Sequence, residues 1–343
     1  MFAHTFRDAD LIDREIVPFL PPRLADLVAG LPPDVKGRLE ELRLRVGRPY
    51  AVLLAGEEHW FLGGRGLVRD PGAAVRASAE DGERLLAAIS RSSVYALEAE
   101  LRHGFVTLPG GHRVGLCGET VVESGRPRTL RYVGAFNIRI ARAVPGAADR
   151  VLPHLIAPGG RIRHTLIVSP PGCGKTTLLR DLARQISAGA PALGLRGTTV
   201  AIVDERSEIA ACRHGVPQLD VGPRTDVSDR CPKEYGIVQL LRAMAPRVLI
   251  TDEVGAATEA QALRDAIHAG VSIIASAHGT DWRDVAQRPA LTPLLDGGVE
   301  RAVVLSRRRG PGTVEAVWDL TLPSPRPSTA RGHMPARTVV SMS

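Results

Sequence analysis

The segment TLIVSPPGCGKTTLLRDLARQIS, residues 165–187, decides the fold of this chain. Its first five residues are a short apolar run typical of a buried strand, and residues 178–187 have the apolar spacing of a helix. Between them lies SPPGCGKTT, Ser169 to Thr177, a glycine-rich loop of the kind whose backbone N–H groups surround a phosphate. A strand, such a loop and a helix in this order predict a P-loop.

Each residue type in this loop has a physical reason. Gly172 and Gly174 let the backbone turn so that successive N–H groups point into one cavity, and the following helix directs its positive end at the same phosphates. Lys175 places a compact charge between the β- and γ-phosphates of ATP, and the Thr176 hydroxyl binds Mg²⁺. Thr177 contacts the α-phosphate or caps the helix. The predicted ATP-binding residues are Pro171, Gly172, Cys173, Gly174, Lys175, Thr176 and Thr177.

A second strand-like run ends in two carboxylates. RVLITDE, residues 247–253, places Asp252 and Glu253 directly after four apolar or β-branched positions. In a nucleotide-hydrolysing site, one carboxylate of such a pair binds the metal ion and the other acts on the attacking water. We predict that Asp252 holds Mg²⁺ through water, and that Glu253 orients or deprotonates the attacking water.

Two further strand ends carry polar residues. AIVDERSEI, residues 201–209, allows Glu205 to present a carboxylate to the metal or to the nucleophilic water. The alternative is a helix amino terminus at which acidic residues are favourable. SIIASAHG, residues 272–279, places His278 where it can sense the γ-phosphate, the alternative being a core or surface histidine.

Arginine supplies the last candidates. Arg139 and Arg142 in FNIRIAR, residues 136–142, stand at the edge of a domain, where an arginine can stabilise charge that develops on phosphate. In a chain this rich in arginine, a solvated face is the alternative. Only three of the 44 basic residues are lysines. Lys175 lies in the loop, Lys36 is interpreted as a surface residue, and Lys233 has no assigned role.

The pattern along the chain predicts two domains. Residues 1–148 carry helical periodicity at 20–31 and 32–42, then strand-like runs at 41–47 and 49–55 and a hairpin signal at Pro109-Gly110-Gly111, which indicates a smaller mixed α/β domain. A further helix is expected at 94–102. In residues 149–322, five apolar runs alternate with helices, which predicts an α/β domain with a mainly parallel sheet. Residues 323–343 are expected to be a disordered basic tail.

Composition limits the other function classes. The net charge of +7 is concentrated at the carboxyl-terminal end, and only 13 residues are aromatic, so the case for nucleic-acid binding is weak. The four cysteines contain no CxxC pair, which favours reduced thiols over a zinc site. No apolar run approaches the length of a membrane span, so we expect no direct membrane insertion.

Two longer segments resemble known motors. LLRAMAPRVLITDEVG, residues 240–255, followed by residues 260–281, is similar to the Walker B and histidine-box region of type II/IV secretion and pilus ATPases. Within that superfamily, PPGCGKTTLLRD (170–181), VDERSEIAA (203–211), GPRTDVSDRCPKEYG (222–236) and GFVTLPGGHRVGLCGE (104–119) resemble the stage III sporulation protein AA family. The resemblance spans about residues 35–310.

This resemblance implies a RecA-like P-loop ATPase that uses ATP and Mg²⁺. It further implies a cytoplasmic homo-hexamer with ATP between subunits, at the base of a mother cell–forespore channel. There the motor would dock on membrane channel proteins of a sporulation secretion complex, and so lie at the inner membrane through its partners. Arg139 and Arg142 could then complete a site in a neighbouring subunit.

Two functions of other classes stay open from the sequence. One is a nucleic-acid-binding P-loop ATPase, and the other is a nucleotide-gated scaffold that binds ATP with little turnover.

The segment from Gly222 to Lys233 has no clear counterpart in pilus motors. It is interpreted as a subunit-contact or regulatory loop, or else as a solvated loop.

Overall fold

The computed structural model describes residues 10–63, 66–90, 104–123, 125–321 and 337–341. The chain divides into two compact units, Met1–Arg142 and Ala143–Ser343. The sequence placed this division after residue 148, whereas the structure places it after Arg142. Ala148 and Val151 are fully buried in a core of the second unit, which accounts for the difference.

The first unit is built on one sheet with the strand order β4-β3-β2-β1-β7-β6-β5. All neighbouring strands in it pair antiparallel. The predicted hairpin is confirmed, because β5 and β6 pair across Pro109–Gly111. The strands are β1 (Leu39–Arg45), β2 (Ala51–Leu54), β3 (Glu57–Phe61), β4 (Leu67–Val68), β5 (Phe105–Thr107), β6 (Arg113–Glu123) and β7 (Arg126–Arg139).

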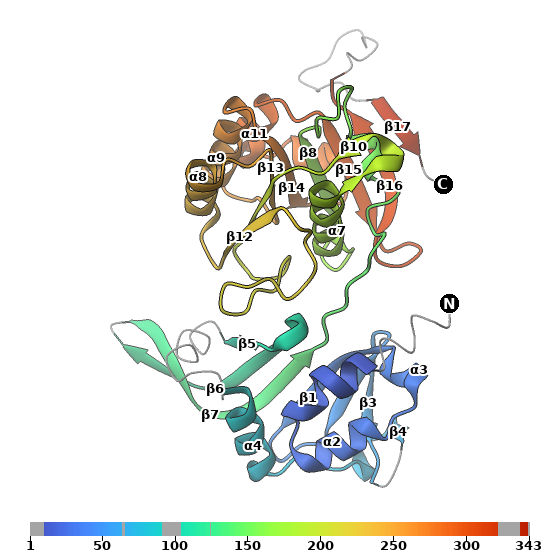
Figure 1. The fold of residues 1–343 in the computed structure, drawn as a ribbon. Helices are drawn as coiled ribbons and strands as arrows, with labels where there is room; N and C mark the ends of the chain where they lie inside the picture. Colours follow the sequence, from blue (N-terminus) through green and yellow to red (C-terminus); the bar gives the residue numbers. More distant parts are fainter. Residues whose placement is uncertain (1–9, 64–65, 91–103, 124, 322–336, 342–343) are drawn as a thin grey trace. The chain divides into compact units, whose positions relative to one another are not determined.

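Short helices complete this mixed α/β unit (Figure 1). Leu24 and Val28 are the buried residues of α2, and they share a core with Tyr50 and Phe136. The helix expected at 94–102 lies outside the described residues. The helices are α2 (Pro22–Ala29), α3 (Pro33–Lys36) and α4 (Ala79–Ser90), with 3₁₀ turns η1 (Val17–Phe19), η2 (Pro71–Ala73) and η3 (Pro109–Gly111).

The helix predicted over residues 32–42 is wrong beyond Lys36, whereas the strand predicted over 41–47 is confirmed as part of β1. From Leu39 onward the chain is strand β1, which pairs with β2 on one side and with β7 on the other. Leu39, Leu42 and Leu44 are buried in this strand. Sheet pairing and burial therefore outweigh the local helical periodicity.

Lys36 is buried, which corrects its interpretation as a surface residue. It is 5% exposed, and its Nζ donates to both carboxylate oxygens of Asp13 at 2.7 Å and to the carbonyl of Ala29 at 2.9 Å. A buried ammonium requires such partners. Asp13 is distant along the chain, so the sequence pattern did not indicate it.

The second unit contains a mainly parallel sheet with the order β12-β11-β13-β14-β8-β15-β16-β17. Strands from β12 to β15 are parallel to their neighbours, whereas β16 and β17 pair antiparallel. The five predicted apolar runs form β8, β11, β13, β14 and β15. The strands are β8 (Thr165–Ser169), β11 (Val200–Asp204), β12 (Thr225–Asp229), β13 (Val248–Thr251), β14 (Ser272–His278), β15 (Arg301–Ser306), β16 (Thr313–Asp319) and β17 (Arg337–Ser341), beside a separate pair β9 (Gly189–Ala190) and β10 (Leu195–Arg196).

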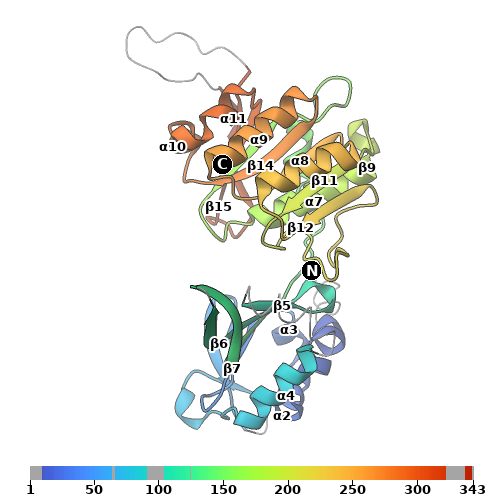
Figure 2. The ribbon, with the colours of Figure 1, turned by 90° about the vertical axis from the view of Figure 1, so that its left-hand side faces the viewer.

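Helices cover both faces of this sheet. On one face α7 packs with Ile167 and Ile202 in one core, and on the other α8, α9, α10 and α11 pack with Leu166 and Val203 in a second core. Figure 2 shows α8, α9 and α11 over that second face. The helices are α6 (Leu152–Leu155), α7 (Lys175–Ala188), α8 (Lys233–Met244), α9 (Ala257–His268), α10 (Trp282–Ala286) and α11 (Thr292–Asp296), with 3₁₀ turns η4 (Pro191–Leu193) and η5 (Pro289–Leu291).

Two segments that were predicted to lack regular structure contain strands. Arg337–Ser341, within the tail expected to be disordered, forms β17 and pairs with β16. Its β-branched run TVV favours a strand, which explains the correction, and residues 322–336 lie outside the described residues. In the segment 222–233, Thr225–Asp229 forms edge strand β12 beside β11, and Lys233 begins α8.

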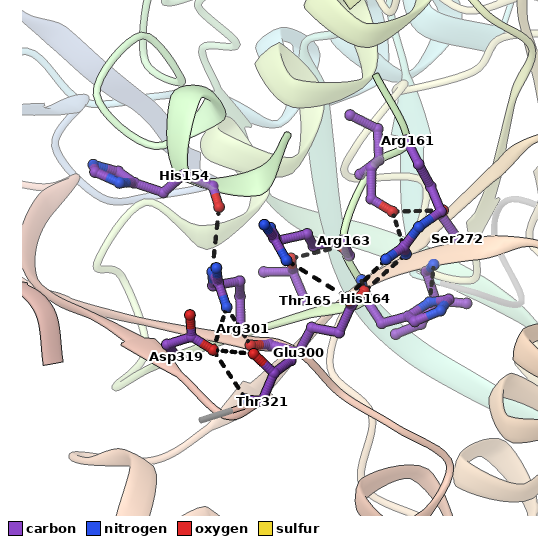
Figure 3. Close-up of polar contacts among 12 residues, drawn as sticks. His154, Arg161, Arg163, His164, Thr165, Ser272, Glu300, Arg301, Asp319 and Thr321 are labelled. Atoms are coloured by element: carbon purple, nitrogen blue, oxygen red, sulfur yellow. Dashed lines mark hydrogen bonds and ion pairs between the residues drawn. The ribbon is translucent and has the colours of Figure 1, made fainter. Parts of the chain in front are cut away.

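A polar network lies at the amino-terminal ends of β8 and β15 (Figure 3). The Glu300 carboxylate pairs with Arg161 at 2.7 Å and accepts the backbone N–H of His164 at 2.9 Å. Arg301 pairs with Asp319 at 2.6 Å. The phosphate loop follows the carboxyl end of β8. This network therefore stabilises the strand ends that lie opposite the phosphate loop.

Candidate active site

The P-loop connects the carboxyl end of β8 to α7, which begins at Lys175. Gly172 and Gly174 have φ angles of 69° and 88°, in the left-handed region that favours glycine. The turn between β15 and β16 packs against the loop, since the Gly312 N–H donates to the Cys173 carbonyl at 2.9 Å. A Cβ at position 174 would lie 3.0 Å from the Gly312 nitrogen. Glycine at 174 is therefore required by both conformation and space.

The Lys175 ammonium is surrounded by oxygen atoms of its own loop. Its Nζ donates to the carbonyls of Ser169 and Pro170 at 3.0 Å each and to the Ser169 hydroxyl at 3.2 Å, and lies 3.4 Å from Nδ1 of His278. Burial lowers the pKa of Lys175, while the charges of Glu253 and Asp252 oppose that shift. The residue at 169, where the strict motif has glycine, thus contributes a ligand for the lysine.

Asp252 follows the carboxyl end of β13 and is 2% exposed. Burial, followed by the nearby charge of Asp204, raises the pKa of Asp252 to about 7. Its Oδ1 has no hydrogen-bond partner in the described part of the protein. A buried carboxylate oxygen without a donor is costly, so this atom is suited to a cation or to its coordinated water.

Glu253 has an unusual backbone conformation. Its φ angle is 42°, a left-handed value that costs a non-glycine residue of order 1 kcal/mol or more. Ser276 in β14 holds this turn, because its hydroxyl accepts the Glu253 N–H at 3.0 Å and its carbonyl accepts the Val254 N–H at 2.7 Å. The neighbouring strand therefore stabilises the strained residue.

The Glu253 carboxylate is held by two nitrogen groups. Oε1 lies 3.0 Å from Nε2 of His278, and Oε2 lies 2.5 Å from Nη1 of Arg206. Because Nδ1 of His278 faces Lys175, the imidazole bridges the loop lysine and this carboxylate. Lys175, His278 and Glu253, which were predicted from three separate motifs, are thus brought together.

The carboxylates after β11 have other partners. Asp204 is fully buried and accepts the backbone N–H groups of Glu208, Ile209 and Ala210 at 2.8–3.0 Å, so it builds the turn after the strand. Glu205 accepts a hydrogen bond from Nζ of Lys233 at 2.7 Å. In this structure Glu205 is engaged in an ion pair.

Arg139 and Arg142 both lie in the first unit. The Arg139 side chain is 62% exposed and its Nε is 3.6 Å from Glu41. Arg142 donates to the carbonyls of Leu39 at 2.6 Å and of Lys36 at 3.0 Å, so its guanidinium stabilises the start of β1. Of the two, Arg139 is the more available for a further contact.

The residues of the loop and of β13 suit ATP with Mg²⁺. The left-handed glycines and the ammonium of Lys175 form a cradle for phosphate. Across the described ranges, no three His, Cys, Asp or Glu side chains are grouped so as to hold a metal ion. At phosphate sites Mg²⁺ takes one or two protein oxygens and completes its shell with phosphate and water. Thr176 and Asp252 supply oxygens of that kind.

Sequence reasoning assigned no role to Arg206 or to Lys233. Arg206 is one of many arginines, and only the fold shows its contact with Glu253. Lys233 is 5% exposed and pairs with both Glu205 and Glu259. The rarity of lysine in this chain was the one signal that could have singled it out.

Comparison with known proteins identifies the family. Residues 13–321 match the family model described as "Sporulation stage III, protein AA". The chain belongs to the stage III sporulation protein AA family. Stage III sporulation protein AA of Bacillus subtilis (strain 168) is 41% identical over 306 residues, which cover 89% of this chain and 94% of that protein. The resemblance inferred from the motifs is confirmed.

Solved structures agree with the predicted fold. The X-ray structure of the Yersinia pseudotuberculosis ATPase DotB has a TM-score of 0.51 at 12% identity, covering 82% of this chain and 74% of that one. The Legionella pneumophila ATPase DotB has a TM-score of 0.50 at 13% identity, covering 78% and 72%. At such identities the likeness concerns the fold alone, and it confirms the predicted RecA-like P-loop NTPase fold. Within the described part of this family member, no helix is long and apolar enough to cross a membrane.

Proposed function

We propose that this member of the stage III sporulation protein AA family binds ATP with Mg²⁺ and hydrolyses it as a secretion-type motor. The supporting observation is the meeting of Lys175, His278 and Glu253 at the carboxyl ends of neighbouring strands β8, β14 and β13. Parallel α/β sheets bind their ligands at the carboxyl ends of the strands. A phosphate loop alone would bind nucleotide, whereas a carboxylate connected to it through one imidazole adds a group that can activate water.

The geometry of the site supports the following roles. Lys175 exchanges the carbonyl oxygens of its own loop for phosphate oxygens, and the loop N–H groups hold the same phosphates. Bound Mg²⁺, for which Thr176 and Asp252 supply ligands, would neutralise charge on the phosphates. Glu253 orients the attacking water or accepts its proton. His278, which contacts both Lys175 and Glu253, couples the position of that carboxylate to the phosphates bound by the loop.

Phosphate release from ATP by the wild-type protein tests this function. We expect steady-state turnover that requires Mg²⁺ and stops when EDTA removes it, because the charge on the phosphates is then left uncompensated. Turnover is expected without added nucleic acid, which separates the motor from a nucleic-acid-dependent ATPase. Tight ATP binding without measurable phosphate release would instead indicate a nucleotide-gated scaffold.

We also propose that the protein forms a homo-hexamer with ATP between subunits. Family resemblance supports this assembly, and Arg139, whose side chain is 62% exposed, is the more accessible of the two candidate arginines. Light scattering at micromolar protein, with a non-hydrolysable ATP analogue and Mg²⁺, is expected to show the mass of six chains. A monomer under those conditions contradicts the ring.

The cellular setting is part of the same proposal. The family supports a cytoplasmic motor that reaches the inner membrane through channel proteins of a sporulation secretion complex.

A further inference from the structure

Lys233 occupies a position that is unfavourable for a lysine. It is 5% exposed, and it is the first residue of α8, where the positive end of the helix dipole disfavours a cation. Burying an ammonium is also costly unless it is paired. Of the other two lysines, Lys175 belongs to the phosphate loop and Lys36 pairs with Asp13 in the first unit. Lys233 therefore needs its own compensation.

Two glutamates supply that compensation. Nζ of Lys233 lies 2.7 Å from Oε2 of Glu205 and 3.2 Å from Oε1 of Glu259. Burial alone would lower the pKa of Lys233, but the hydrogen bonds and charges of these carboxylates outweigh it and raise the pKa. The group is therefore a cation at neutral pH. A compact ammonium can bridge two carboxylates that approach from different elements.

Glu259 connects Lys233 to the segment that follows Glu253. While its Oε1 faces Lys233, its Oε2 accepts the backbone N–H groups of Gly255 at 2.8 Å and Ala256 at 3.0 Å. These two amides end the short connection between β13 and α9. The ion pair thus holds the connection in which Glu253 lies.

Glu205 connects Lys233 to the second contact of Glu253. The residue after Glu205 is Arg206, whose Nη1 lies 2.5 Å from Oε2 of Glu253. Lys233 therefore anchors segments on both sides of the Glu253 carboxylate. Such anchoring is needed because Glu253 has a left-handed backbone, which persists only where its surroundings impose it.

We propose that Lys233 is a positioning residue, which holds Glu253 in its working orientation through ion pairs with Glu205 and Glu259. The inference rests on the proposed ATPase function, and Lys233 itself touches neither nucleotide nor water in it. It also gives a role to the 222–236 motif, which the hydrolytic site otherwise leaves unexplained. Glu205, predicted as a catalytic carboxylate, then acts through Lys233.

Replacement of Lys233 by methionine tests this role by separating kcat from KM. We expect kcat to fall about 10- to 100-fold, the scale of a small misplacement of a reacting group. KM for ATP and Kd for ADP are expected to stay within about threefold, because the P-loop is untouched. Lys233→Arg keeps the charge and is expected to recover part of kcat. Lys36→Met removes an equally buried, paired lysine from the first unit and should leave kcat unchanged.

A double-mutant cycle with Glu253→Gln tests whether the effect passes through Glu253. If it does, Lys233→Met adds less than about a threefold loss in the Glu253→Gln background, because coupled residues are not additive. Losses that multiply, or a rise in KM that matches the fall in kcat, would overturn the positioning role. An unchanged kcat in Lys233→Met would overturn it as well.

Hydrogen exchange without nucleotide gives a readout that does not depend on turnover. In Lys233→Met, the amides of Gly255 and Ala256 are expected to exchange faster than in the wild type, while those of α7 exchange at the same rate. Equal exchange in residues 253–256 of the two proteins would overturn the inference. A wild-type protein that releases no phosphate refutes the proposed function, and the exchange comparison still decides whether Lys233 holds this segment.

Discussion

Alanine at position 175 is expected to weaken nucleotide binding strongly and to abolish turnover. The Lys175 ammonium is the cation within the loop, and its three oxygen partners at 3.0–3.2 Å show that it is directed across the cradle. Hydrogen bonds to charged groups contribute about 1.5–3 kcal/mol each, so losing one to phosphate weakens binding by about tenfold to a hundredfold, and losing two weakens it by more than about a hundredfold. Titration of ADP and ATP with Mg²⁺, followed by calorimetry, measures the loss.

The Lys175→Arg variant is the matched control for charge. Its planar guanidinium is larger than an ammonium and is not expected to fit between the loop and the phosphates, so binding should stay weak although the charge is kept. Circular dichroism and thermal unfolding check that both variants fold. Undiminished turnover in Lys175→Ala would refute the assignment of this loop.

Glutamine at position 253 is expected to separate binding from turnover. The amide keeps the shape of the side chain and can still contact Arg206 and His278, but it cannot accept a proton from water. Loss of a general base costs about 10²- to 10⁴-fold in rate. Calorimetry is expected to give an ATP affinity close to that of the wild type, while phosphate release falls by that factor.

Asp265→Asn provides the corresponding control in the same unit. Asp265 is an exposed carboxylate on α9, and it accepts a hydrogen bond from the side chain of Gln261 at 2.7 Å. The substitution makes the same acid-to-amide change outside the site, so turnover should match the wild type. A loss of turnover in this control would mean that the Glu253→Gln result reflects a general loss of charge or of fold.

Local sequence predicted the strand, the loop and the helix of the P-loop. The loop from Ser169 to Thr177 is contiguous, and its flanking strand and helix are set by apolar spacing within about twenty residues, so no distant contact is needed to recognise it. The five buried strands were recognised for the same reason. Their order in the sheet could not be predicted, because β8 lies between β14 and β15 through pairings that span more than a hundred residues.

Contacts between distant residues account for what the sequence could not predict. Lys233 pairs with Glu205 and Glu259, which lie 28 and 26 residues away along the chain. The hydrogen bond that joins Lys175 to His278 spans 103 residues. The predicted helix extended a few residues into what is β1, and the predicted tail contains β17; both differences come from strand pairing with distant segments. Sequence patterns indicate elements and motifs, whereas these contacts depend on the whole fold.

The central claim is that the phosphate loop and Glu253 form one hydrolytic site. Phosphate release at saturating ATP and Mg²⁺, measured side by side for the wild type and Glu253→Gln, tests this claim most directly. The account predicts steady turnover by the wild type and a rate at least about a hundredfold lower for the variant, with ATP bound equally well by both. Equal rates in the two proteins would contradict it.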